Sequence, residues 1–414
     1  MHRQKVKTLV DQEAKREKEM LKQTLDKKLI SLKLDIATRQ NRSFLGINVQ
    51  YCENNKLKIS TLAIKELKSR HTAENIILTL EEVLEEFNLS KSQIYSVTTD
   101  NGSNFVKAFS DDFINSEFNT TEESTNECPE INFENEDDGF ELEDELDILD
   151  EETYVGYNVK FLRCAAHTLQ LAVLKFAKAN ENKKIILAAR KIVKVLRTTN
   201  VRYVLQTLGQ SSPIIDCDTR WSSTHDMMES LITMKDVCVE LLQKGIIKGT
   251  ITAVNWNSIK ELVEILKPAK EATLKFQSEQ LTAGEFHEAW TRMKLDIQAK
   301  NSVKSRKLLE YIVERENILM SNDAILTALY LDPRYKSLVV DKVDTVRESV
   351  LSVAKRLLEL QFQNDVAVCN VPVVTVSEED EYENLLASRD ATRLSGGGRG
   401  DVEQRILNLR EELL

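Results

Sequence analysis

The sequence predicts an α/β unit with a mixed sheet, followed by a large all-helical region. Before residue 110, apolar and polar residues alternate in several short segments, which is typical of strands. From Ala165 onward, apolar residues recur at helical spacing for about 200 residues. Glycine and proline are scarce, at 12 and 5 of 414 residues, which argues against an all-β sandwich or barrel.

Alternation predicts a meander of three strands and two later strands in the same sheet. We expect these strands at 29–35, 44–51, 57–67, 93–99 and 160–164. Asn54-Asn55 is a hairpin turn, and Thr72 caps a helix whose apolar residues continue to Phe87. A short helix, NFVKAF, follows the fourth strand, so the predicted order is β-β-β-α-β-α.

The later region contains several amphipathic stripes. One begins at Leu169, a second at Ile185 and a third at Ile259, and Pro268 is expected to kink or end the third helix. Further helices are expected at 282–298, 303–319 and 341–363.

An acidic segment interrupts the α/β unit. Asp111 to Glu152 holds 19 acids and no base; without them the chain carries 48 acids and 56 bases, against a net charge of −11 for the whole. Such a segment is expected to be disordered, whereas the mildly basic remainder tolerates nucleic acid. The expected divisions are a charged lead-in helix (1–27), a first sheet part (28–118), an acidic insert (119–152), a sheet continuation (153–175), a helical domain (176–365) and a linker with a tail (366–414).

Several classes of protein find no support in the sequence. No apolar run reaches the ~18–20 residues that span a bilayer, and the charged N-terminus does not resemble a secretory signal. The six cysteines form no CxxC pair, which favours a reducing compartment over a disulfide scaffold. Walker A, GxGxxG, GxSxG and HExxH patterns are absent, so no small-molecule substrate is evident.

Two aspartates end predicted strands of one sheet. If Asp35 and Asp100 meet at a shared edge, they can hold a divalent cation of the kind that activates oxygen in nucleases. The alternative is that Asp35 opens a turn and that Asp100 forms an Asx turn before Asn101-Gly102. Spacing alone favours the alternative, because aspartates are common at strand ends.

Cys164 and His167 lie three apart at a helix start and could share a metal ion. A zinc site would need further ligands, with Cys217 and His225 as candidates. Because the chain has no second close pair, the pattern argues against zinc and favours a structural Cys and His.

Two further segments carry basic residues. In DTRWSST, Arg220 can bind a phosphate and Trp221 can stack on an unpaired base. The plainer interpretation, a helix start with one core tryptophan and a serine cap, is favoured for the segment taken alone. In LDPRYK, the proline breaks a helix and the turn exposes Arg334 and Lys336.

Taken together, six segments resemble the hAT superfamily of DNA transposases, especially its BED-finger, domesticated members. They are SLKLDIATRQNRSFLGINVQY, VTTDNGSNFVKAF, RCAAHTLQLAV, DTRWSSTHDMMESL, LKPAKEAT and ALYLDPRYKSL, in that order across about residues 28–340. The resemblance implies an RNase H-like core interrupted by a large helical insertion domain.

The resemblance also implies roles for individual residues. Asp35 and Asp100 match the first two catalytic carboxylates, which would bind Mg²⁺ or Mn²⁺. Cys164 and His167 match a Cys-x-x-His element near the catalytic centre. Trp221 matches a residue that stacks on a flipped base, with Arg220 beside the phosphate.

The sequence also departs from the family pattern. Family members carry a third carboxylate, a glutamate, beyond the helical domain and a BED zinc finger before the core. No such segments are evident here, and Glu411 and Glu412 stand in a different context. Ile36-Ala37 replaces a tryptophan that often follows the first aspartate.

We therefore expect a degenerate hAT-type protein of the nucleus that has lost catalysis and retains weak binding of DNA, or binding of proteins or of a second copy. One alternative is an active Mg²⁺-dependent transposase or nuclease, completed by a third acid not evident in this chain. Another is a helical interaction scaffold. No membrane partner is expected.

Overall fold

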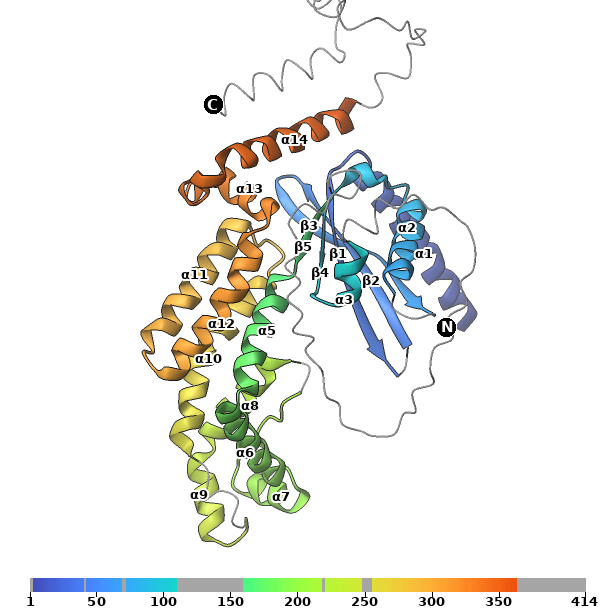
Figure 1. Cartoon of the computed structure of the whole chain (residues 1–414). Helices are drawn as coiled ribbons and strands as arrows, with labels where there is room; N and C mark the ends of the chain where they lie inside the picture. The colour runs from blue at the N-terminus through green and yellow to red at the C-terminus, as the bar shows by residue number, and fades with distance from the viewer. Residues whose placement is uncertain are drawn as a thin grey trace, which may run out of the picture.

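The computed structural model shows a sheet with its own helices beside a larger group of helices (Figure 1). It describes the residues in the ranges 3–40, 42–68, 72–109, 159–217, 220–247 and 255–362. The acidic insert and the tail predicted after residue 365 lie outside these ranges.

The sheet has five strands in the order β3-β2-β1-β4-β5. They are β1 (Ile30–Arg39), β2 (Arg42–Glu53), β3 (Lys56–Leu67), β4 (Ile94–Thr99) and β5 (Lys160–Arg163). The first three form the predicted antiparallel meander, and β4 and β5 continue the sheet in parallel with β1. Asn54 and Asn55 both have positive φ, 51° and 57°, as a tight hairpin turn requires.

Helices cover one face of this sheet. They are α1 (Arg3–Leu25), α2 (Ala73–Glu86) and α3 (Ser103–Ala108), and a short 3₁₀ helix, Lys91–Gln93, precedes β4. Leu32 and Leu34 of β1 pack into the same core as Ile76 of α2 and Phe105 of α3. The predicted cap of α2 is present, because the Thr72 side chain accepts from the Asn75 N–H. The lead-in helix is anchored at its end, where Leu25 is fully buried.

The second group of helices shares a separate core. Its members are α5 (Ala165–Lys178), α6 (Asn180–Leu196), α7 (Thr199–Thr207), α8 (Trp221–Thr233), α9 (Lys235–Gln243), α10 (Trp256–Phe276), α11 (Ala283–Ala299) and α12 (Val303–Met320). Apolar stripes from these helices meet in one cluster that includes Phe176, Ile192, Leu266 and Trp290. Within the described part of 225–320 there is no strand.

The last two α-helices of the described residues lie near the sheet (Figure 1). They are α13 (Asp323–Leu331) and α14 (Val343–Phe362), joined through a 3₁₀ helix at Lys336–Lys342. Arg356 of α14 donates to the carbonyls of Lys91, Ser92 and Ile94, which ties α14 to the start of β4.

Two predicted details differ from the structure. The division at residue 175 falls inside α5, and Leu169, Ala172 and Val173 pack into the helical core, so the helical group starts at Ala165. The apolar stripe of α5 shows that the helix packs against a core, but it does not show which of the two cores that is. Of the two outcomes predicted at Pro268, the end of the helix is wrong, because α10 runs through the proline to Phe276; the kink stays a prediction. In the described residues, no helix is both long and apolar enough to span a membrane.

Candidate functional site at the sheet edge

Asp35 does not end a strand or open a turn, the two outcomes predicted for it, because β1 runs on past it to Arg39. Asp100 directly follows β4, the parallel neighbour of β1, as predicted. In this pair Leu32 lies opposite Val97 and Lys33 opposite Thr98. Extending the register by two residues brings Asp35 beside Asp100, and adjacent strands are about 4.8 Å apart. Both aspartates lie on the face opposite the buried Leu32 and Leu34, as strand alternation requires. The prediction that the two carboxylates share one face is therefore consistent with the register.

The strand on the other side of Asp35 leaves room for a ligand. Gly46 of β2 is the cross-strand partner of Asp35, so no side chain stands beside the carboxylate there. This polar face continues with Asn48, which pairs with Lys33, and Gln50, which pairs with Ser31. A polar sheet face beside an uncovered acid suits a hydrated, charged ligand better than an apolar one.

Asp100 has a local structural role as well. Its Oδ1 accepts from the Gly102 N–H at 3.0 Å, which is the Asx turn that the alternative interpretation predicts. This turn fixes one carboxylate oxygen at the end of β4. No hydrogen bond to the second oxygen, Oδ2, is found among the described residues. The two interpretations of Asp100 are thus compatible, since one oxygen is enough to bind a cation.

His167 reaches the same place from the helical group. The Cys164 N–H donates to the Thr99 carbonyl at 2.8 Å, so α5 starts directly beside the end of β4. Burial lowers the pKa of His167, whereas the negative charges of Asp100 and Asp35 oppose that shift. The positive charge of Arg315 lowers the pKa further. The imidazole is accordingly neutral at pH 7 and lies within electrostatic range of both acids.

A neighbouring contact supports this junction. The Asn101 side-chain amide donates to the hydroxyl of Thr168, the residue after His167, at 3.4 Å. The amide oxygen of Asn101 is buried without a partner. Cys164 is half-buried at the start of α5. The predicted Cys-x-x-His element thus lies beside the two aspartates, and their negative charges act on the pKa of His167.

The described residues hold one group of three possible metal ligands whose donor atoms all lie within 4.8 Å of one another. This group is His225, Asp226 and Glu229 on α8, far along the chain from the sheet edge. The ammonium of Lys270 already lies among them, 3.4 Å from His225 Nδ1 and 3.7 Å from Glu229. The group contains no cysteine, so the zinc set of Cys164, His167, Cys217 and His225 is not assembled.

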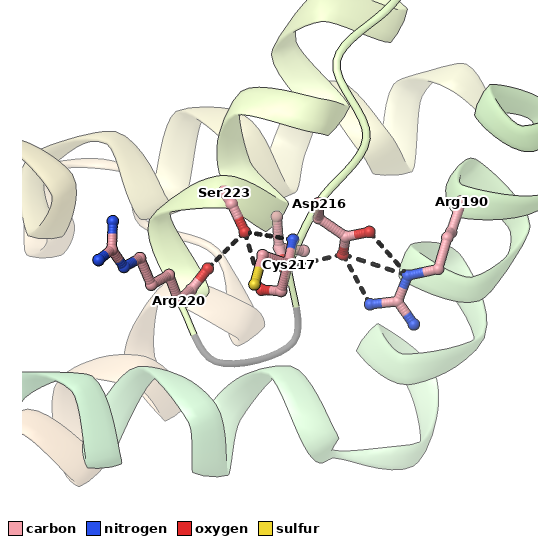
Figure 2. A network of polar contacts seen from close by, with 6 residues as sticks. Arg190, Asp216, Cys217, Arg220 and Ser223 are labelled. Carbon is pink, nitrogen blue, oxygen red and sulfur yellow. Dashed lines mark hydrogen bonds and ion pairs between the residues drawn. The ribbon is translucent and has the colours of Figure 1, made fainter. Parts of the chain in front are cut away.

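Polar contacts hold the residues on either side of Asp218-Thr219 against α6 and the start of α8 (Figure 2). Asp216, whose side chain is only 1 % exposed, forms a bidentate ion pair with Arg190 of α6, with N–O distances of 2.6 and 2.9 Å. The Thr224 hydroxyl also donates to Asp216, at 3.1 Å. The Ser223 hydroxyl accepts from the Cys217 N–H at 2.8 Å and lies 2.6 Å from the Arg220 carbonyl.

Trp221 is the first residue of α8 and is only 4 % exposed, within the helical core. Stacking on a base requires an exposed ring face, so the structure gives Trp221 a packing role, as the plainer interpretation predicts. Ser223 bonds to the preceding loop and Arg220 occupies the cap position, so the expected serine cap is absent. Arg220 is exposed, and its role in binding DNA stays a prediction.

The LDPRYK loop packs on the start of α11. Asp332 pairs with Arg334 at 2.7 Å, and the Arg334 guanidinium lies over the Tyr335 ring. A Cβ at Gly284 would lie 2.1 Å from Asp332 Oδ2, so the glycine is what lets the loop approach the helix. The loop is therefore a tertiary contact as well as a basic turn.

Sequence reasoning missed two basic residues near the start of α5. Arg163 ends β5, and Arg315 of α12 acts electrostatically on both His167 and Arg163. The position of Arg163 directly before the Cys-x-x-His element was an available signal. Arg315 lies on α12, some 150 residues later in the chain. Its sequence neighbours are those of an ordinary charged helix, so they give no sign of a role at the site.

Comparison with known proteins supports the resemblance drawn from the motifs. A family model, the ZBED1 RNase-like helical domain, matches residues 162–265, from β5 into α10. The Hobo transposable-element transposase of Drosophila melanogaster is 27 % identical over 262 residues, which is 62 % of this chain and 32 % of the relative. Human zinc finger BED domain-containing protein 4 is 24 % identical over 190 residues, 42 % of this chain and 16 % of the relative.

The chain thus spans a third or less of the length of these curated relatives. The range of the family model contains two of the six motifs, RCAAHTLQLAV and DTRWSSTHDMMESL. The comparisons support a transposase-derived protein that is similar to hAT-family members.

Proposed function

We propose that this chain is a DNA-binding, transposase-derived protein whose sheet is an RNase H-like core. The support is the strand order, in which an antiparallel meander is extended by two parallel strands. The observation that carries the proposal is the pairing of Lys33 with Thr98, because extending this register by two residues brings Asp35 beside Asp100. His167 lies within electrostatic range of both aspartates.

The cation at this site would be Mg²⁺ or Mn²⁺. Both prefer oxygen ligands, and two carboxylates with several waters bind them weakly. The residues fit such an ion, because Asp35 lies beside Gly46 and Asp100 keeps an oxygen outside its turn. Asp35 and Asp100 would hold the ion, and its charge would neutralise negative charge on a nearby DNA phosphate.

We further propose that the 414-residue chain does not cleave DNA by itself. Among the described residues, no third acid joins Asp35 and Asp100 in a group of close potential ligands. Two-ion strand cleavage needs enough carboxylates to hold both ions, and a lone pair holds one ion poorly. The nucleus follows as the place of action, because that is where genomic DNA is bound.

Two measurements on the full chain test this function. In the first, a fluorescein-labelled duplex is titrated at several salt concentrations, and we expect log K to fall linearly with log salt, as phosphate contacts require. Absence of salt-dependent binding would leave the helical scaffold as the better function.

The second measurement is strand cleavage of labelled duplex and hairpin DNA with Mn²⁺. We expect no cleavage above background. Cleavage that Asp100→Asn abolishes, and that the matched exposed variant Asp296→Asn on α11 retains, would instead establish the active nuclease.

A further inference from the structure

Positive charge is concentrated in three consecutive helices of the helical group. The segment from Ala165 to Thr207, which forms α5, α6 and α7, contains nine Lys and Arg residues and a single acid, Glu181. Outside the acidic segment 111–152, the whole chain has 56 bases and 48 acids, so the excess of bases in these three helices equals its entire surplus. The mild basicity of the chain is therefore a local property of this part of the helical group.

Some of these bases already have acidic partners. Lys175 pairs with Glu314 of α12, and Arg190 pairs with Asp216. Four exposed lysines of α6 differ, because their side chains form no ion pair or hydrogen bond with any residue that the structure describes. They are Lys183, Lys184, Lys191 and Lys194.

The four lysines share one face of α6, which we call the lysine face. At 3.6 residues per turn they fall within an arc of about 100°, on the side of the helix opposite the buried Ala189 and Leu196. From the first lysine to the last, the face extends over about 16 Å of helix axis. Helix α6 lies in the part of the helical group away from the sheet (Figure 1).

The helix α10 shows how exposed lysines are arranged elsewhere in the described structure. Lys260 and Lys267 are exposed and seven residues apart, the same spacing as Lys184 and Lys191. However, α10 contains three glutamates and four lysines, so its charges nearly balance, whereas α6 contains five bases and one acid. An ordinary solvated helix mixes both signs, and the lysine face does not.

We propose that the lysine face of α6 binds the phosphate backbone of duplex DNA. This inference rests on the DNA-binding part of the proposed function and adds a contact surface separate from Asp35 and Asp100. B-DNA carries one phosphate per about 3.4 Å of axis on each strand, so a duplex along α6 presents several phosphates to a face about 16 Å long. Lysine binds phosphate as a flexible point charge, which suits backbone contacts that do not read the bases.

An acidic protein is the competing occupant, and the composition of the face disfavours it. Protein interfaces are depleted in lysine and depend on apolar or aromatic anchors in their centres. Among the four lysines, Leu187 is 48 % exposed, and a single exposed leucine is common on any protein surface. A face of unpaired lysines around one leucine fits the dense, regular charge of a phosphate backbone better.

The test uses two matched double variants of the full chain. Lys184→Gln/Lys191→Gln removes two charges from the lysine face, and Lys260→Gln/Lys267→Gln removes two exposed charges at the same spacing from α10. Each is titrated with a labelled 20-base-pair duplex across a range of NaCl concentrations. We expect the α6 variant to reduce the slope of log K against log salt by about 1.8, or 0.9 for each phosphate contact, and the α10 variant to leave it unchanged.

Two further comparisons identify a backbone contact. The α6 variant should weaken binding equally for two duplexes of unrelated sequence, because phosphate contacts carry no sequence information. Lys184→Arg/Lys191→Arg keeps both charges and should retain the wild-type slope. Circular dichroism and melting temperature check that every variant folds, which we expect because the replaced side chains are exposed and unpaired.

A fluorescein-labelled polyglutamate at the same ionic strength tests the competing occupant. We expect the wild type to bind the duplex more tightly than polyglutamate, because the charge on DNA is denser. Tighter binding of polyglutamate, lost in the α6 variant, would assign the face to an acidic protein and overturn the proposal.

The outcomes for the lysine face and for the proposed function differ. Salt-dependent DNA binding with the same slope in the wild type and both double variants overturns the lysine face and leaves the DNA-binding function standing. A wild type without salt-dependent DNA binding overturns that function and, with it, DNA as the occupant of α6. Equal losses in the α6 and α10 variants would show a general effect of net charge and would also overturn the lysine face.

Discussion

Lys33 of β1 lies opposite Thr98 of β4 in a parallel pair, so the next residue on the same face of each strand is an aspartate. Two carboxylates at this separation repel each other unless a cation or a basic group lies between them. His167 lies within electrostatic range of both but is held neutral by burial. The pair is therefore a site whose charge a divalent cation can balance.

The first prediction concerns this cation. Titrating the full chain with Mn²⁺ by calorimetry should give weak binding, with a dissociation constant on the order of 10⁻⁴–10⁻³ M, because two carboxylates leave most of the ion hydrated. Asp35→Ala should abolish the heat of binding, and Asp296→Ala should leave it unchanged. Tight binding, or binding that survives Asp35→Ala, would show that the site lies elsewhere.

Much of the sheet could be predicted because strand alternation is a local signal. In β1, the apolar Leu32 and Leu34 alternate with the polar Lys33 and Asp35, which shows the strand and its two faces without any tertiary information. The Asn54-Asn55 turn marks the end of the second strand in the same local way. The cap at Thr72 is equally local. The end of β4 could be located, and with it the position of Asp100.

The rest depends on packing between distant segments. Nothing near Arg315 in sequence shows that α12 brings it to His167, about 150 residues earlier. The apolar stripe of α5 fits either core, and only the contacts assign it to the helical group. The Arg220-Trp221 motif contains no information about burial. The sequence therefore could not show whether the Trp221 ring lies in the core, as it does, or on the surface.

The second prediction follows from that burial. Trp221→Ala should lower the free energy of unfolding by about 3–5 kcal/mol, the usual cost of removing a large buried aromatic ring. Urea denaturation followed by circular dichroism measures this. Tyr203→Ala on α7 is the control, because Tyr203 is 69 % exposed and its loss should change stability by about 0.5 kcal/mol or less.

Trp221→Phe separates packing from base stacking. It should recover most of the lost stability and leave DNA affinity unchanged at temperatures where the variant is folded. A folded Trp221→Phe variant with a large, specific loss of affinity for hairpin DNA would restore the stacking role.

The third prediction concerns the ion pair in Figure 2. Asp216→Asn should destabilise the protein by about 1.5–3 kcal/mol, because a charged hydrogen-bond acceptor for Arg190 is lost in a nearly buried place. Thr224→Val should cost less, since it removes one neutral donor at 3.1 Å. Chemical denaturation of both single variants and the double variant measures the coupling.

The coupling should be non-zero, because Arg190 and Thr224 share the same carboxylate. Asp296→Asn, an exposed change of the same type, should leave stability unchanged. Strictly additive effects of Asp216→Asn and Thr224→Val would mean that the two contacts do not act as one network.

The fourth prediction is a pH dependence centred on His225. Burial lowers the pKa of this histidine and the positive charge of Lys270 lowers it further, while Glu229 and Asp226 oppose the shift. Its Nε2 is buried without a partner, and the Lys270 ammonium lies 3.4 Å from its Nδ1. A protonated imidazole would therefore leave one N–H without an acceptor and bring the other beside a positive charge. The unfolded chain, with a histidine pKa of about 6.5, therefore binds the proton first.

The contribution of neutral His225 to the free energy of unfolding should therefore be complete above pH 6.5. Below that pH the free energy of unfolding should fall, by up to about 1.4 kcal/mol per pH unit for each such histidine. His167 and His287, whose pKa values burial also lowers, contribute with the same sign. Urea unfolding between pH 7.5 and 5.5 measures the total slope, and His225→Gln should reduce that slope by the share of one proton. A slope unchanged in His225→Gln would mean that the imidazole is protonated as readily in the folded protein as in the unfolded chain, with Asp226 and Glu229 outweighing burial and Lys270.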